Sequence, residues 1–206
     1  NYLHIHDKDY YPTKSLTCVQ HPLDHILKYG FSAGHGESRP AKRIETASIL
    51  GCISLETAQN EMHGGQSVPN FDYAMAEGVK KTYRKQYFRA LAQYIEVRFD
   101  MSASDAAALT AAIKEALGTD VTMHTAEAYA EKLRAFLPRH QAENGFQIIT
   151  GDAARAAAEY AAKTAYKETD AATYQAMEAL VHNLNTMNSR AGAQVPFSSL
   201  NYGTDT

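Results

Sequence analysis

The sequence predicts an α/β fold in which short strands near the two ends of the chain flank several long helices. Ser15–Gln20 contains the β-branched residues Thr17 and Val19, and Val195–Tyr202 follows a polar bend that contains Gly192. Between these segments, apolar residues recur at three- and four-residue steps, as in amphipathic helices. Hydrophobic residues make up 45% of the 206 residues, so we expect one good-sized core and a single domain.

Composition excludes several classes of protein. The net charge of −3 argues against a surface that coats nucleic acid or a polybasic membrane surface. No apolar run approaches the ~20 residues of a membrane span, and no signal-peptide pattern opens the chain. The two cysteines, Cys18 and Cys52, cannot build a disulfide framework, so we expect a reducing cytoplasm. Because the chain starts at Asn1 and ends at Thr206 within a polar run, we also expect a piece of a longer protein.

The first eleven residues alternate in a period of two, which favours an extended segment with His4 and His6 on one face. A polar pair that lines a pocket is one interpretation. A metal-dependent hydrolase built on His4, His6 and Asp7 is the alternative, but it needs further ligands that no other motif marks.

The helices that follow are bounded by residues that commonly start and stop helices. We expect helices over Pro22–Gly30, Ala41–His63 and Asn70–Phe99, with Gly64 and Gly65 closing the second. The glycines of the loop Gly30–Arg39 match neither the P-loop nor the dinucleotide-binding spacing. By pattern alone, Cys18 is a small buried residue of a strand and Cys52 a core residue of a helix.

The middle of the chain is rich in alanine and marks no chemistry. We expect helices over 102–118, 125–138 and 153–167, with Pro138 ending the second, and a final helix over 171–188. This region, at about 100–170, reads as a helical insertion. The long helices and the lysines beside them also fit a helical nucleotide-binding or dimerisation module, which is a second alternative.

Six segments resemble, in the same order, the anaerobic class III ribonucleotide reductases, which are glycyl-radical enzymes that act on ribonucleoside triphosphates. They are His4–Tyr10, Leu16–Leu23, Arg39–Ala47, His63–Ser67, Val79–Lys85 and His182–Thr206. This resemblance implies a ten-stranded α/β barrel built as two antiparallel halves. The present chain would form the first half as a single partial domain, with a helix-rich elaboration.

The resemblance also implies roles for individual residues. In this family a glycyl radical is passed to a cysteine, the resulting thiyl radical removes the 3′ hydrogen of the ribose, and the 2′ hydroxyl leaves as water. A second cysteine, on the first barrel strand, assists the later reduction, and Cys18 occupies its position. The substrate-binding candidates are His4, His6, Asn185, Ser189 and Arg190.

Further implied partners follow from the same family. Arg39, Lys42 and Lys85 match positions where a deoxynucleotide or ATP effector binds between the subunits of a homodimer. The family's radical is installed by a radical-SAM iron–sulfur activating enzyme, and the family carries a structural zinc. We find no metal site, radical cysteine or glycyl-radical motif in these 206 residues, so we expect this chain alone to be inactive. Many relatives have two adjacent cysteines where this chain has Cys18 and Val19, which leaves formate or a thiol protein open as reductant.

Overall fold

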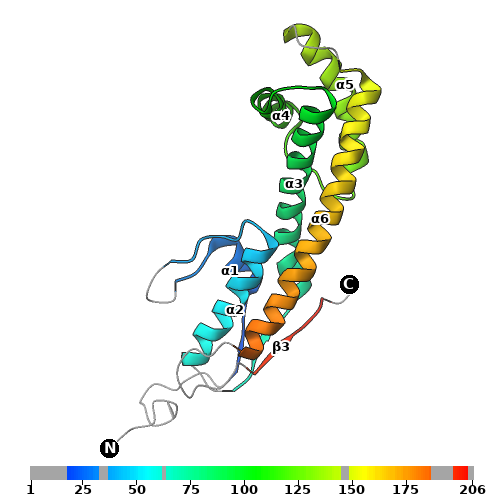
Figure 1. Ribbon diagram of the computed structural model, residues 1–206. Helices are drawn as coiled ribbons and strands as arrows, with labels where there is room; N and C mark the ends of the chain where they lie inside the picture. Colours follow the sequence, from blue (N-terminus) through cyan, green and yellow to red (C-terminus); the bar gives the residue numbers. More distant parts are fainter. Residues whose placement is uncertain (1–17, 33–36, 62–63, 145–148, 187–196, 204–206) are drawn as a thin grey trace, which may run out of the picture. The chain divides into compact units, whose positions relative to one another are not determined.

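The computed structural model describes residues 18–32, 37–61, 64–144, 149–186 and 197–203 (Figure 1). The chain divides into two compact units, one of Asn1–Val79 with Ala172–Thr206 and one of Lys80–Ala171. Six helices and three short strands form the described part, which confirms the α/β class. The ten-stranded barrel and the single partial domain stay predictions.

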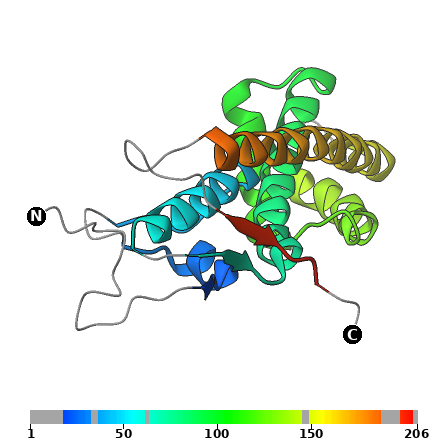
Figure 2. The ribbon, with the colours of Figure 1, turned by 90° about the horizontal axis from the view of Figure 1, so that it is seen from below.

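The first unit contains a small parallel sheet in the strand order β1-β2-β3. The strands are β1 (Val19–Gln20), β2 (Gln66–Val68) and β3 (Ser198–Leu200), and Figure 2 shows β2 and β3 side by side. The two predicted strand segments therefore contribute to one sheet. The central strand was missed, because three residues after a glycine pair are too few to display a period of two.

The two faces of this sheet have different surroundings. Neighbours in register on parallel strands point to the same face, so Gln66 lies with Val19 and Ser198, while Ser67 lies with Gln20 and Ser199. Gln66 and Val68 are 2% and 1% exposed, and Gln66 bonds to helix α2 (Ile44–Glu61). Gln20 and Ser199 are exposed and Ser67 is half-buried. One face is thus covered by helices, and we call the other the open face.

The helices of the first unit close the covered side. They are α1 (Leu23–Tyr29), α2, the start of α3 (Phe71–Arg98) and the end of α6 (Gly151–Thr186), and they agree with the predicted helices within a few residues except at α6. Gly30 ends α1 at a φ of +80°, where a Cβ would lie 2.0 Å from the carbonyl oxygen of Ser38. The core of this unit joins α1, α2, α3 and α6 through Leu23, Leu27, Ile44, Leu55, Phe71, Met75 and Leu180.

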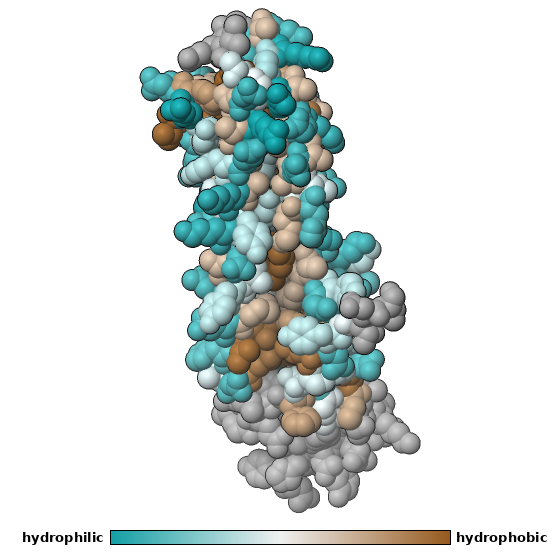
Figure 3. Space-filling view, turned by 90° about the vertical axis from the view of Figure 1, so that its right-hand side faces the viewer, coloured by the Kyte–Doolittle hydropathy of each residue, from teal (hydrophilic) through white to brown (hydrophobic). Residues whose placement is uncertain are grey.

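Exposed hydrophobic side chains are more numerous in the first unit. Of the large ones that are exposed among the described residues, the first unit holds Tyr29, Ile49, Ile53, Tyr73, Tyr174, Val181, Phe197 and Tyr202, and the second holds Val97, Met123, Tyr160 and Tyr166. Figure 3 shows one face of the molecule on which hydrophobic residues gather. Separately, no helix in the described ranges is long and apolar enough to cross a bilayer.

The second unit is a helical body made of parts of α3 and α6 with α4 (Ala103–Leu117) and α5 (Ala126–Asn144). Ser102 caps α4 as predicted, since its hydroxyl accepts a hydrogen bond from the amide of Asp105. Its core combines aromatic side chains with small residues of α6, namely Tyr83, Tyr87, Phe88, Tyr129, Ala154, Ala157, Ala158, Ala161 and Ala165. These alanines let α6 pack closely against bulky neighbours.

Two predicted helix boundaries in this unit are wrong. Pro138 lies inside α5 instead of ending it, although its ring removes one backbone hydrogen bond. Beyond it, the Gln141 side chain accepts a hydrogen bond from the amide of Ile149, and both residues are buried. The predicted helices 153–167 and 171–188 are one continuous helix, because residues 168–170 contain neither Gly nor Pro.

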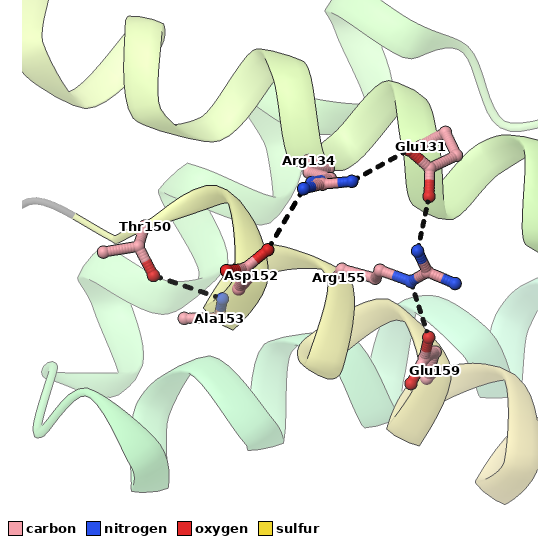
Figure 4. A network of polar contacts seen from close by, with 7 residues as sticks. All are labelled: Glu131, Arg134, Thr150, Asp152, Ala153, Arg155 and Glu159. Carbon is pink, nitrogen blue, oxygen red and sulfur yellow. Dashed lines mark hydrogen bonds and ion pairs between the residues drawn. The ribbon is translucent and has the colours of Figure 1, made fainter.

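Charged side chains join α5 to the start of α6 (Figure 4). Arg155 pairs with Glu131 at 3.0 Å and with Glu159 at 2.8 Å, and Arg134 pairs with Asp152 at 3.2 Å. The hydrogen bond that Arg155 donates to the Glu159 carboxylate, together with the charge of Glu131, raises the pKa of Arg155 above its usual value. Because all these side chains are at least partly exposed to solvent, their ion pairs are expected to add little to the free energy of unfolding. Their main effect is to orient the ends of the two helices.

Candidate functional site

Cys18 lies one residue before β1 and its side chain is exposed. Backbone hydrogen bonds from Val19 to Gly65 (3.2 Å) and from His21 to Ser67 (2.8 Å) hold this segment against β2. The prediction that Cys18 is buried in the strand is therefore wrong for this chain. The physical reason is that β1 begins only at Val19, so Cys18 lies in a bend before the sheet, where its side chain is exposed.

The open face carries a row of polar side chains from all three strands. Gln20 comes from β1, Ser67 from β2 and Ser199 from β3, and the exposed Cys18 directly precedes β1. A thiol can donate a hydrogen atom or act as a nucleophile, and an amide with two hydroxyls can hydrogen-bond to sugar or phosphate oxygens. Sequence reasoning had not assigned roles to Gln20, Ser67 or Ser199, although each lies in a segment that resembled the family.

A buried hydrogen-bond network lies on the opposite, covered face. Gln66 donates to the carbonyl of Leu55 at 3.0 Å and to the side chain of Gln59 at 2.9 Å. Its own side-chain oxygen must then accept from His21 Nε2, at 2.7 Å. Ser54 completes the network, with its hydroxyl oxygen 3.3 Å from His21 Nδ1. The contact with Gln66 therefore requires a proton on Nε2 of His21.

This network positions the strand ends that carry Cys18. His21 is 8% exposed and directly follows β1, and Gln66 is 2% exposed within β2. Because a buried polar group is costly when it loses its partner, the network favours one alignment of β1, β2 and α2. His21 and Gln66 are positioning residues that the sequence motifs contained without revealing their contact.

Helix α2 also buries a thiol and a carboxyl group. Cys52 is 1% exposed, and its thiol lies 3.9 Å from the carbonyl oxygen of Leu180, which confirms it as a core residue. Burial raises the pKa of Cys52, with Asn183 opposing the change and Glu56 adding to it. Burial also raises the pKa of Glu56, whose two carboxylate oxygens are buried without a hydrogen-bond partner. The Cys52 thiol is therefore expected to be unreactive, and the ionised form of the Glu56 carboxyl group is unfavourable.

The remaining predicted site residues are spread over both units. Asn185 is exposed near the end of α6, where it donates to the carbonyl of Val181 at 2.7 Å. Arg39 and Lys42 are exposed in the first unit, and Lys85 is exposed in the second. The described contacts do not join any of these residues to Cys18. Outside the described residues lie His4, His6, Asp7, Ser189 and Arg190.

Metal ligands are not clustered in the part of the chain that the structure describes. No group of three or more His, Cys, Asp or Glu side chains there could hold a metal ion. The hydrolase alternative rests on residues outside that part, so the described residues add nothing to it.

Comparison with known proteins gives two matches that agree. The family model for anaerobic ribonucleoside-triphosphate reductase matches residues 1–206. Over 85 residues the chain is 33% identical to the anaerobic ribonucleoside-triphosphate reductase of Enterobacteria phage T4, an alignment that covers 40% of this chain and 14% of the phage protein. Since the family model spans every residue, this chain belongs to the anaerobic ribonucleoside-triphosphate reductase family.

Proposed function

We propose that this chain supplies the strand cysteine and part of the substrate surface for the conversion of ribonucleoside triphosphates to 2′-deoxyribonucleoside triphosphates. The observation that carries the proposal is the exposed thiol of Cys18, one residue before β1, in a chain of this family. The network of His21 and Gln66 occupies the covered face, so the open face is the side from which substrate would approach.

The role of Cys18 is to give a hydrogen atom to the substrate radical that remains after the 2′ hydroxyl has left. Its S–H bond breaks and a C–H bond forms at C2′, which leaves a 3′ ketone and a sulfur radical. Formate or a thiol protein would then supply two reducing equivalents, a hydrogen atom to the sulfur radical and an electron, with a proton, to the 3′ carbonyl, before the hydrogen first removed from C3′ returns. The family's glycyl radical supplies the initial oxidising equivalent. For this role the thiol must be protonated and must reach the sugar, and the exposed position of Cys18 directly before β1 supports the second condition.

Polar groups around Cys18 would hold the nucleotide. Gln20, Ser67 and Ser199 lie on the open face and can hydrogen-bond to ribose or phosphate oxygens. The motifs that resemble the family add five substrate-binding candidates, which are His4, His6, Asn185, Ser189 and Arg190.

The open face must be covered in the working enzyme. A substrate radical in contact with water and other solutes would be lost to side reactions, so the reaction needs an enclosed site. We propose that the open face forms part of the interior of the family's ten-stranded barrel, completed by further strands of the reductase. The exposed hydrophobic residues of the first unit support this, because such residues commonly mark surfaces that become covered.

Regulation is proposed to follow the family pattern. Arg39, Lys42 and Lys85 are exposed cations that would contact the phosphates of a deoxynucleotide or ATP effector at a homodimer interface. A radical-SAM activating enzyme would install the radical, and the reaction would take place in the cytoplasm.

The proposal is tested by comparing Cys18→Ser with Cys52→Ser in the full reductase polypeptide that contains this chain. Each activated variant is incubated anaerobically with a ribonucleoside triphosphate and reductant, and deoxynucleotide is measured. Cys18→Ser is expected to give no product above background, because a hydroxyl O–H bond is too strong to replace the S–H bond as hydrogen donor. Cys52→Ser is expected to retain turnover and to lose about 1–3 kcal/mol of stability. Equal losses in two folded, activated variants would reject the assignment.

A further inference from the structure

The second unit contains a pocket between α3 and α4 that the proposed chemistry does not use. Its volume is about 450 Å³, within the range of small-ligand sites. Four cationic side chains line it, Arg84, Lys85 and Arg89 from α3 and Lys114 from α4. No carboxylate is among its lining residues. A pocket with this lining favours an anionic ligand.

Two of the four cations already have a carboxylate partner. Arg84 forms a close ion pair with the exposed Asp120, and Arg89 lies 3.7 Å from Glu168. The Arg84 Nε atom is nevertheless buried without a hydrogen-bond partner. Since 3.7 Å exceeds hydrogen-bond distance, Arg89 keeps donor capacity for another acceptor.

The two lysines are not neutralised by an ion pair among the described residues. Lys114 Nζ lies 4.9 Å from the centre of the Phe88 ring, a contact that leaves its charge uncompensated. Lys85 is exposed at the pocket. Counting Asp120 and Glu168 against the four cations leaves an excess of two positive charges at one place on a chain whose net charge is −3.

Neutral groups of the pocket complete its chemistry. The hydroxyl of Thr110 donates to the carbonyl of Ala106 at 2.8 Å, so it is not a free donor. Thr119 is exposed in the turn after α4, and its hydroxyl can serve as a donor. Ala92, Ala107 and Phe88 form an apolar wall. Multiple cationic donors around an apolar wall suit a ligand with several phosphate oxygens.

We infer that this pocket binds the phosphate groups of a nucleotide-sized ligand within a single chain. Arg84, Arg89, Lys85 and Lys114 contact the phosphates, and the apolar wall lies beside the rest of the ligand. This site shares Lys85 with the effector proposal but differs from it in two respects. It needs no second copy of the chain, and it uses α4 in place of Arg39 and Lys42.

Binding of inorganic triphosphate and of a ribonucleoside triphosphate to the 206-residue chain, measured by titration calorimetry, tests this inference. Both ligands are expected to bind, more weakly at high salt. Lys114→Ala and Lys85→Ala are each expected to weaken binding about tenfold, the effect of losing one charge-assisted contact. Lys163→Ala, a matched change of an exposed lysine outside the pocket, is expected to leave affinity unchanged.

Several outcomes would overturn the inference. They are no binding of inorganic triphosphate, equal weakening by Lys163→Ala, or full affinity in Lys114→Ala. Weakening by Lys42→Ala would assign the binding to the effector site instead. Circular dichroism of each variant checks folding, and because all four lysines are exposed, loss of fold is not expected. None of these measurements depends on reductase turnover, so the inference can fail while the proposed function holds.

Discussion

The two compact units differ in how completely each one covers its own core or sheet. The second unit encloses its own core, in which Leu133, Leu137 and Ile113 are fully buried. The first unit buries one face of its sheet and leaves the other face open, with Gln20 and Ser199 exposed on it. A closed helical body needs nothing more for stability, whereas an open sheet face with exposed edges commonly meets a partner or further strands.

This difference indicates how the work is divided between the units. In the first unit, buried hydrogen bonds between His21, Gln66 and Ser54 fix the positions of the strands. The second unit uses ordinary core packing and surface ion pairs, such as Arg155 with Glu131. Substitution of residues that serve the proposed reaction is therefore expected to lower activity. Substitution of core residues in the helical unit is expected to lower the free energy of unfolding.

The largest expected effect on stability is in the second unit. Leu133→Ala removes a side chain that is 0% exposed and leaves a cavity, so the free energy of unfolding should fall by about 2–5 kcal/mol. Val97→Ala, at a position that is 82% exposed, is the control and should change it by less than about 0.5 kcal/mol. Urea unfolding measures both. Hydrogen exchange that rises in β2 as much as in α5 would contradict the distinction between the two units.

A smaller effect of opposite sign is expected at Glu56 in the first unit. Because burial raises its pKa, its stabilising contribution is complete below the pKa of the unfolded chain and is lost as pH rises through the folded pKa. Glu56→Gln should therefore stabilise the protein at pH 7 by roughly 1–2 kcal/mol and change little near pH 4. The exposed Glu115→Gln is the control. Destabilisation by Glu56→Gln at pH 7 would indicate a partner for the ionised carboxylate.

The smallest effect is expected at Tyr129 in the second unit. Its hydroxyl donates to the carbonyl of Gly118 at 2.8 Å, so Tyr129→Phe should cost about 1 kcal/mol. Burial raises the pKa of Tyr129 to about 12, above the value of about 10 for an unfolded tyrosine. The wild type should therefore lose its advantage over Tyr129→Phe as pH rises from 10 to 12. A difference that stays constant over that range would contradict the burial of this hydroxyl.

The sequence was most informative where local chemistry decides the structure. Caps and stops such as Ser102 and Gly30 located helix ends correctly, and the motifs around Cys18 and Lys85 indicated the family. It failed where tertiary packing outweighs local preference. Pro138 is accommodated within α5, and β2 depends on neighbours that are distant in the sequence.

The site shows the same division. Cys18 could be selected from its motif, but its exposure depends on where the strand begins, which is set by pairing with the distant β2. The contact between His21 and Gln66 joins residues 45 positions apart, and no spacing rule predicts such a pair. Strand register, which sets Gln20, Ser67 and Ser199 on one face, is likewise a property of the assembled sheet.

The most direct test of the account is protection of Cys18 by substrate in the full reductase polypeptide. Alkylation of each cysteine is followed by peptide mass spectrometry with and without a ribonucleoside triphosphate, under anaerobic conditions. With substrate at ten times its Kd, labelling of Cys18 should slow roughly tenfold, because the nucleotide covers the open face beside the thiol. Cys52, buried in α2, should react slowly in both cases. Labelling of Cys18 that is unchanged by saturating substrate would contradict the account.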